Sequence, residues 1–327
     1  MRATRRHFIL GSAGLAALPL AVPRAFAAGY PERVITFVCP WPAGGTADAT
    51  MRALCTAASK DLGQNIVVEN RAGASGMLGL RSMASARPDG YTIGQIPISV
   101  TRFSQLGMVQ VDPMNDLTYL ARTSGQTFGV AVRDDAPWKT LKDFVADAKA
   151  RPGKINYASA GIGGATHVGM EEFALVAGIK LNHIPYKGGS PALVDLLGGQ
   201  VDALADSSSW APHVKSGKLR LLATWGESRT LEFPQVATLR EQGFDVVVDA
   251  PNGVGAPKGL DPAVEKRLRE AFKVASASSE FVAACRQIDA PVMYLDGGEY
   301  RQYAEAVYRK ETGLIQRLQL KELMAKG

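Results

Sequence analysis

The sequence predicts a two-domain α/β protein in which each domain is a mainly parallel sheet flanked by helices. Short β-branched runs alternate with amphipathic helical stretches after residue 30, which is the order typical of parallel sheets covered by helices. Glycine-rich loops follow four of the expected strands. Two irregular segments, 123–126 and 249–253, indicate crossings between the domains. The middle of the chain is therefore expected to be inserted into the first domain.

The individual elements follow from hydrophobic periodicity and from turn and capping residues. We expect the first domain to begin with strands 34–38, 65–69, 91–96 and 117–122 and helices 47–62 and 77–86. The second domain should hold strands 128–133, 155–158, 181–185, 201–204, 219–224 and 246–248 and helices 141–150, 168–177, 191–197 and 210–215. Helices 262–276, 279–286 and 299–321 then return to the first domain.

These elements place the domain boundaries at the two crossings. Domain 1 is expected to comprise residues 28–124 together with 251–327, and domain 2 residues 125–250. Two domains joined by two crossings have a natural hinge and a cleft between them.

The first 27 residues have the features of an export signal. Arg2, Arg5 and Arg6 precede an apolar stretch, 8–22, and Ala25-Phe26-Ala27 fits a small-x-small cleavage site. The paired arginines followed by Phe8-Ile9-Leu10 also fit a twin-arginine signal, with general secretion as the alternative. We therefore expect a periplasmic protein.

Charge and cysteine content exclude several functions. The net charge of +6 comes largely from four arginines in the signal, which leave 33 basic and 31 acidic residues in the remainder. No basic stripe with interleaved aromatics occurs, so nucleic-acid binding is not expected. Cys39, Cys55 and Cys285 match no zinc spacing, and we expect neither metal nor cofactor. Buried thiols are expected, with a Cys39–Cys55 bridge left open.

The first glycine-rich loop, 38–48, joins a predicted strand to a predicted helix. A strand that turns through Gly44 and Gly45 into a helix leaves backbone N–H groups unpaired at the positive end of the helix dipole. Such a site suits a phosphate or a carboxylate.

Three further loops, 70–76, 159–167 and 186–190, repeat this arrangement. Ligands of open parallel sheets bind beyond the carboxyl ends of the strands. Two loops belong to each predicted domain, so together they could hold one small anion across the cleft. We expect this set of loops, rather than any one of them, to form the binding site.

Catalytic motifs are missing from the sequence. There is no Gly-x-Ser-x-Gly elbow and no Walker loop, and Gly161-Ile-Gly163 lacks the third glycine of a dinucleotide loop. His183 lies in an apolar strand pattern, which favours a structural role. His167 begins a helix after a glycine-rich loop and could contact a ligand or simply cap and pack.

The segment 30–48, YPERVITFVCPWPAGGTAD, resembles the opening of Bug-type (TctC-like) solute-binding receptors of tripartite tricarboxylate transporters. Five later segments resemble further blocks of that family in the same order: VENRAGASG at 68–76, PDGYT at 88–92, YASAGIGGATH at 157–167, HIPYKGGSPA at 183–192 and LLGGQVD at 196–202. The resemblance covers essentially the whole mature chain. It implies a Venus-flytrap, type II-like periplasmic binding protein that catalyses no reaction.

The resemblance also nominates ligand-binding residues. In the family, a carboxylate is held largely by backbone groups and hydroxyls of the first glycine-rich loop, with ordered waters, and by the loops of the second domain. The candidates carried over or added from the neighbouring loop positions are Trp41, Ala43, Gly44, Gly45, Thr46, Asp48, Ser75, Ser159, Gly163, Thr166, His167 and Asp206. Trp41, Ile98-Ser-Val-Thr101 and Asp206-Ser-Ser-Ser209 depart from the usual family pattern and leave ligand identity open.

Several of these residues have two readings. Asp48 could cap the first helix or accept a hydrogen bond from a ligand, and Asp206 has the same ambiguity. Trp41 could stack on a planar ligand or cover the core. Lys187 and Arg71 could offset the acidic side chains or remain solvated at the surface.

The leading functional hypothesis is a monomeric receptor that captures a small organic acid and delivers it to membrane transporter subunits. The acid could be a di- or tricarboxylate, an amino acid or an aromatic acid. Two rivals remain: a secreted α/β enzyme acting on a small carboxylate, and a receptor that feeds a signalling sensor.

Overall fold

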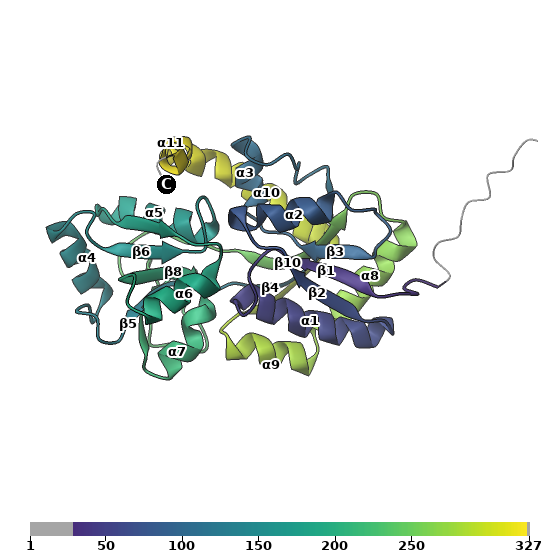
Figure 1. The fold of residues 1–327 in the computed structure, drawn as a ribbon, viewed down its shortest axis with the longest axis horizontal. Helices are drawn as coiled ribbons and strands as arrows, with labels where there is room; N and C mark the ends of the chain where they lie inside the picture. The colour runs from purple at the N-terminus through teal and green to yellow at the C-terminus, as the bar shows by residue number, and fades with distance from the viewer. Residues whose placement is uncertain (1–28, 326–327) are drawn as a thin grey trace, which may run out of the picture.

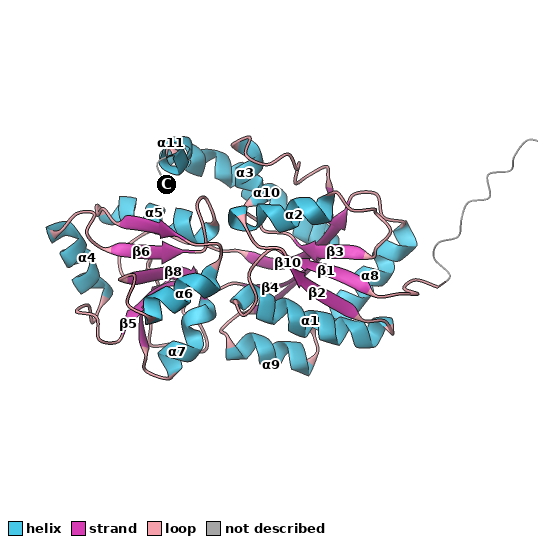
Figure 2. Ribbon diagram, in the orientation of Figure 1, coloured by secondary structure: helices cyan, strands magenta, loops and turns pink. Residues whose placement is uncertain are grey.

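The computed structural model describes residues 29–325, and the predicted signal peptide lies outside them. The chain forms two lobes, each built around one sheet, as Figure 1 shows. Helices cover both faces of each sheet (Figure 2). The two-domain α/β fold class is thus confirmed.

The first lobe holds a six-stranded sheet in the order β11-β4-β10-β3-β1-β2. Its strands are β1 (Ile35–Cys39), β2 (Ile66–Asn70), β3 (Thr92–Gln95), β4 (Leu117–Gly125), β10 (Pro251–Pro257) and β11 (Val292–Asp296). Its helices are α1 (Thr46–Leu62), α2 (Met77–Ala84), α3 (Val100–Gln105), α8 (Pro262–Ser276), α9 (Ser279–Gln287) and α10 (Gly297–Arg317). A short 3₁₀ turn, Ala74–Gly76, precedes α2.

The second lobe holds a five-stranded sheet in the order β7-β6-β8-β5-β9. Its strands are β5 (Phe128–Arg133), β6 (Asn156–Ser159), β7 (Asn182–Pro185), β8 (Ala203–Ser207) and β9 (Leu219–Thr224). Its helices are α4 (Leu141–Ala150), α5 (Ala165–Ala177), α6 (Gly189–Leu197) and α7 (Ala211–Lys215), with a 3₁₀ turn at Ser208–Trp210 before α7.

Both sheets are mixed: most strands of each sheet run in the same direction, as expected, and a minority runs the opposite way. Strands β1, β2 and β3 are parallel, as are β6, β7 and β8. Strand β4 leads out of the first lobe and β10 leads back into it, so the two run antiparallel to each other. The two crossings therefore account for the antiparallel pair of β4 and β10.

Five details of the sequence prediction were wrong. Strands β10 and β11 and helix α3 were missed, and 246–248 forms no strand in the structure. Strand β10 is fully buried, but its sequence PNGVGAP is rich in turn-forming residues and hides the strand signal. The expected helix 299–321 is broken after Arg317, where Gln319 adopts a φ of 47°, and continues as α11 (Leu320–Ala325).

The C-terminal helices join the two lobes. Helix α10 packs on the first lobe, whereas α11 lies over the second lobe near α5 (Figure 1). Leu320 of α11 is fully buried, and Arg317 forms an ion pair with Glu172 of α5. A segment of the first lobe thereby covers part of the second.

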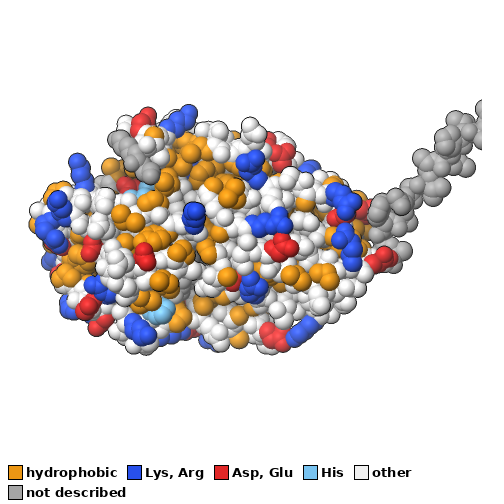
Figure 3. Space-filling view, in the orientation of Figure 1, with side chains coloured by type: hydrophobic (Ala, Val, Ile, Leu, Met, Phe, Trp, Pro, Cys, Tyr) orange, Lys and Arg blue, Asp and Glu red, His pale blue; other side chains and the backbone are white. Residues whose placement is uncertain are grey.

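Further observations concern the cysteines, the helices and the surface charges of the part of the chain that the structure describes. Cys39, Cys55 and Cys285 are buried free thiols, so the open question of a Cys39–Cys55 bridge is answered. Within residues 29–325 no helix is long and apolar enough to cross a membrane, and no cluster of three metal-ligating side chains occurs. On the face drawn in Figure 3, basic and acidic side chains are interspersed.

Candidate ligand-binding site

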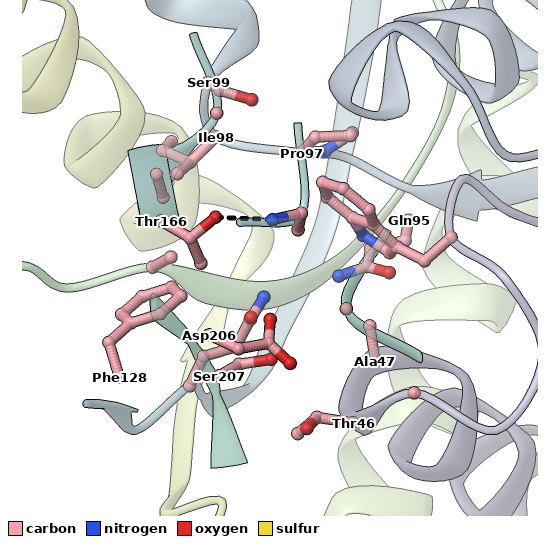
Figure 4. A pocket seen from close by; sticks show the side chains of 18 of the residues that line it. Thr46, Ala47, Gln95, Pro97, Ile98, Ser99, Phe128, Thr166, Asp206 and Ser207 are labelled. Atoms are coloured by element: carbon pink, nitrogen blue, oxygen red, sulfur yellow. Dashed lines mark hydrogen bonds between the residues drawn. The ribbon is translucent and has the colours of Figure 1, made fainter. Parts of the chain in front are cut away.

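A cavity of about 60 Å³ lies between the lobes. The first lobe contributes the loop before α1, the first residues of α1, Gln95 at the end of β3 and residues 97–99 after it. The second contributes the starts of α5 and α6 and the end of β8, and residues of both crossings complete the wall. Figure 4 shows Thr166, Phe128 and Asp206 on one side of this cavity and Gln95, Ala47 and Thr46 on the other.

Three helices present their N-termini to the cavity. Helix α1 begins after Gly45, α5 after Gly164 and α6 after Gly188, and no described side chain caps any of the three. Residues of each first turn line the cavity. The free N–H groups and the positive ends of the dipoles make such termini anion sites. No lysine, arginine or histidine occurs among the described residues that line the cavity, so these termini supply the positive potential.

Three polar atoms of cavity-lining residues are buried without a hydrogen-bond partner in the described chain. They are Thr46 Oγ1, Trp41 Nε1 and Gln95 Oε1. Thr46 is 3% exposed and Gln95 1% exposed, so bulk water does not reach them. A buried polar group without a partner costs about 1–3 kcal/mol. Three such atoms around one cavity indicate that a ligand or ordered water supplies their hydrogen-bond partners.

Asp48 does not line the cavity and instead shapes the first loop. Its carboxylate accepts hydrogen bonds from the Gly44 amide at 3.0 Å, from Asn70 Nδ2 at 2.7 Å and from Arg52 Nε at 3.1 Å. Burial would raise the pKa of this carboxyl, but the hydrogen bonds from Arg52, Asn70 and Gly44 outweigh it and hold the pKa below the usual value. An ionised Asp48 thus fixes the loop that precedes α1.

Asp206 lies at the end of β8 and lines the cavity. The side chain is 2% exposed, and burial raises its pKa to about 7. Hydrogen bonds from the Ser209 hydroxyl and the Ser207 amide oppose that rise only in part. The charge of Asp206 therefore changes near neutral pH, directly in the cavity wall.

The third loop divides its polar residues between the cavity and the interior. Thr166 lines the cavity, and its Oγ1 accepts a hydrogen bond from the Ala160 amide at 3.1 Å (Figure 4). Ser159 and His167 face inward: Ser159 Oγ lies 2.7 Å from His183 Nε2, and His167 Nδ1 accepts from the Gly163 amide at 3.0 Å. These two residues therefore support the loop from behind.

The two histidines form a stacked pair with ring centroids 4.0 Å apart. Burial lowers the pKa of His167 to about 3 and that of His183 to about 4. Both are neutral at physiological pH. A neutral ring is required for His167 Nδ1 to accept from an amide, so the pair holds the third loop as an uncharged unit.

Three other candidates lie where the lobes touch. The Ala43 carbonyl accepts from Ser190 Oγ at 3.1 Å, and Ser75 Oγ donates to the Ile162 carbonyl at 2.6 Å. The Gly163 carbonyl accepts from Arg102 Nη1 at 2.8 Å. Ala43, Ser75 and Gly163 themselves do not line the cavity.

The structure thus brings five of the twelve nominated residues together at the cavity: Trp41, Gly45, Thr46, Thr166 and Asp206. Gly44 is exposed, with a φ of 80° that suits glycine at this turn. Trp41 also packs against the core of the first lobe, so it fits both readings. Arg71 and Lys187 are exposed at the surface, outside the cavity wall.

Sequence reasoning missed several lining residues, above all Gln95, Gln126 and Phe128. Gln95 ends an otherwise apolar strand, and a polar residue at the carboxyl end of a buried strand is a usable signal. Phe128 and Gln126 lie at the first crossing, where nothing in the local pattern distinguishes a cavity wall from the core.

The family model described as the tripartite tricarboxylate transporter family receptor (TctC) matches residues 50–320. The chain belongs to this receptor family. A UPF0065 protein from the gbd 5′ region of Cupriavidus necator is 41% identical over 324 residues, which cover 97% of this chain and 98% of the relative. The protein BugT of Bordetella pertussis is 34% identical over 264 residues, or 78% and 81% of the two chains.

Solved structures agree with this membership. The periplasmic binding protein BugD is 28% identical with a TM-score of 0.84, covering 89% of this receptor and 99% of BugD. MatC of Rhodopseudomonas palustris, solved with bound malate, is 26% identical with a TM-score of 0.76, covering 88% and 98%. A second R. palustris protein, solved with adipate, is 25% identical with a TM-score of 0.83 over the same shares. The Bug-type resemblance is confirmed, and the receptor family is one of solute-binding proteins rather than enzymes.

Proposed function

We propose that this receptor binds a small organic carboxylate between its lobes in the periplasm and delivers it to membrane transporter subunits. One observation carries the proposal: three uncapped helix N-termini converge on a cavity that also holds the unpartnered Thr46 hydroxyl and Trp41 N–H. All of these groups can donate to a carboxylate oxygen. The malate and adipate bound to two relatives support the same ligand class.

The cavity suits a ligand with an apolar skeleton and polar ends. Trp41, Pro97, Ile98 and Phe128 give its wall an apolar surface. The amides at the starts of α1 and α5 come from different lobes, so a ligand that contacts both favours the arrangement in which the lobes meet. We take residues 28–124 with 251–327 and residues 125–250 as the two units that move, in a monomeric receptor.

The rival hypothesis of an enzyme has one suggestive feature, the short contact between Ser159 Oγ and His183 Nε2. Ser159 is fully buried and does not line the cavity, so a substrate in the cavity would not meet its hydroxyl. The family membership argues for binding without turnover.

A thermal-shift panel tests the proposal. Purified mature receptor is heated with acetate, succinate, malate, adipate, citrate, aspartate, glutamate and benzoate, and with the neutral amides of the same acids as matched controls. Because a ligand that binds only the folded state stabilises it, at least one acid should raise the Tm by several degrees while its amide does not. Equal effects of acid and amide, or no shift across the panel, would contradict the proposal.

A further inference from the structure

Gln95 lies at the carboxyl end of β3 and forms part of a buried amide network between the crossings. Gln95 Nε2 donates to Asn252 Oδ1 at 3.0 Å, and Gln126 Nε2 donates to the same oxygen at 3.0 Å. Asn252, in β10, is fully buried. Both glutamines line the cavity, and Asn252 lies behind them.

The orientation of this network is set by the backbone. Asn252 Nδ2 lies 3.3 Å from the Gly125 carbonyl and 3.1 Å from Ser124 Oγ. A carbonyl can only accept, so the nitrogen of Asn252 must face it and the oxygen must face the two glutamines. Turning the Gln95 amide around would oppose two oxygens at 3.0 Å. Gln95 therefore uses its N–H₂ group on Asn252 and keeps its oxygen for another partner.

That oxygen, Gln95 Oε1, is buried and finds no donor among residues 29–325. A carboxylate cannot satisfy it, because both groups only accept hydrogen bonds. A hydroxyl or an amino group can. Asp206, on the opposite side of the cavity, is a second acceptor when ionised.

We propose that the ligand of this receptor carries a hydroxyl or amino donor beside its carboxylate, and that Gln95 Oε1 accepts its hydrogen bond. This inference rests on the carboxylate-binding function proposed above. Asn252 is then a positioning residue, since it presents the Gln95 oxygen without reaching the cavity. Acids that lack the donor make no hydrogen bond to Gln95 Oε1 and bind more weakly.

Titration calorimetry with matched acids tests the inference. Malate and lactate are compared with succinate and propionate, which lack only the hydroxyl, and aspartate is compared with succinate for the amino group. Among the acids that carry a hydroxyl or amino group, the one that binds most tightly should bind at least tenfold more tightly than the matched acid without that group. The hydroxyl and amino arms distinguish the two kinds of donor.

Variants test whether Gln95 causes the difference in affinity between acids with and without the donor. In Gln95→Met the ratio of affinities should fall below threefold, mainly through weaker binding of the donor-bearing acid. Asn252 Oδ1 still accepts a hydrogen bond from Gln126 Nε2 in this variant, so it is not left without a partner. Gln105→Met is the control, because Gln105 lies in α3 outside the cavity wall, and it should keep the wild-type ratio.

The outcomes separate this inference from the proposed function. Equal binding of matched acids by the wild type, or an unchanged ratio in Gln95→Met, overturns the inference and leaves the carboxylate receptor intact. If the folded wild type binds none of these acids nor any other acid of the thermal panel, the proposed function fails, and the inference fails with it. The wild-type comparison needs no substitution, so it decides the inference even if Gln95→Met does not fold.

Discussion

Thr46 combines two roles at one position: it opens α1, and its buried hydroxyl has no partner among the described residues. The same hydroxyl in Thr50, one turn later, is satisfied by the carbonyls of Thr46 and Ala47. The difference in pairing, not in residue type, marks Thr46 as a group available to a ligand.

Thr46→Val should weaken binding of the acid about tenfold or more, because a hydrogen bond to a charged oxygen contributes about 1.5–3 kcal/mol. The free energy of unfolding should stay within about 0.5 kcal/mol of wild type, since valine has the same shape and removes no bond of the protein. Calorimetry and urea denaturation measure the two quantities. Thr56→Val, at an exposed position of the same helix, is the control, and equal affinity in both variants would remove Thr46 from the site.

Asp206 supplies the titrating group of the cavity. Its folded-state pKa is raised from 3.8 to about 7 by burial, so between these values the native state holds a proton that the unfolded state has lost. Stability from this group is therefore fully present below about pH 4 and declines as the pH rises towards 7. His167 and His183 have lowered pKa values and act in the opposite sense. Their contribution to the free energy of unfolding decreases as the pH falls below 6.5.

The Asp206→Asn variant isolates that contribution. The unfolding free energy of the ligand-free wild type, minus that of Asp206→Asn, should fall as the pH rises from 4 to 7 and level off above 7. Because both proteins keep the histidine pair, its effect cancels in the difference. Urea denaturation at several pH values measures it. A difference that does not change over this range would show that Asp206 titrates normally.

The sequence could nominate these side chains but not their directions. Thr46 and Asp206 were candidates because the resemblance to the receptor family nominated their positions, and both line the cavity. Asp48 and His167 came from the same reasoning, yet their acceptors are used by the loop amides of Gly44 and Gly163. Which way a loop side chain points depends on tertiary partners that no local pattern contains. Gln95 was missed although it ends an apolar strand, where a polar residue can indicate a binding site.

At the scale of elements, the alternation of strands and glycine-rich loops was enough to place α1, α5 and α6 with their N-termini together. Strand β10, which leads the chain back from the second lobe, was harder to predict from the sequence. Its sequence is rich in residues that favour turns, and it forms a strand because it pairs with β3 on one side and β4 on the other. Tertiary pairing overrides local preference there.

Helices α3 and α10 meet through a buried ion pair that also reaches the other lobe. Arg102 donates to both oxygens of Glu311, at 2.8 and 2.6 Å, and to the Gly163 carbonyl. Both charged side chains are less than a tenth exposed. Removing one partner would leave a buried charge uncompensated.

Arg102→Met should therefore lower the free energy of unfolding by about 3–5 kcal/mol. The double variant with Glu311→Met should regain much of that loss, because no unpaired charge remains. Arg301→Met is the matched control: its pair with Glu305 on α10 is half-exposed and contributes at most about 1 kcal/mol. Urea denaturation measures the free energy of unfolding of each variant. Similar decreases in Arg102→Met and Arg301→Met would refute a special role for the buried pair.

At the scale of the molecule, the two lobes touch around the cavity. Ser75 meets Ile162 and Ser190 meets Ala43, each across the cleft. Two crossings favour a hinge motion in which the ligand draws the lobes together. The sequence predicted this architecture because both crossings interrupt the strand–helix alternation.

Small-angle scattering tests the motion. The radius of gyration should decrease when the acid identified by the thermal panel is added at saturation, since ligand contacts from both lobes favour the closed arrangement. An acid without effect in the panel serves as control. Identical scattering with and without the bound acid would mean that the lobes do not move on binding.

The central claim is that one carboxylate binds between uncapped helix N-termini from two lobes. Isothermal titration of the mature receptor with the most stabilising acid, and with its neutral amide, tests it most directly. We predict one saturable site per chain for the acid, at least 100-fold weaker binding of the amide, and an unchanged acid recovered afterwards. Absence of saturable binding, equal affinity for acid and amide, or conversion of the acid to a product would contradict the account.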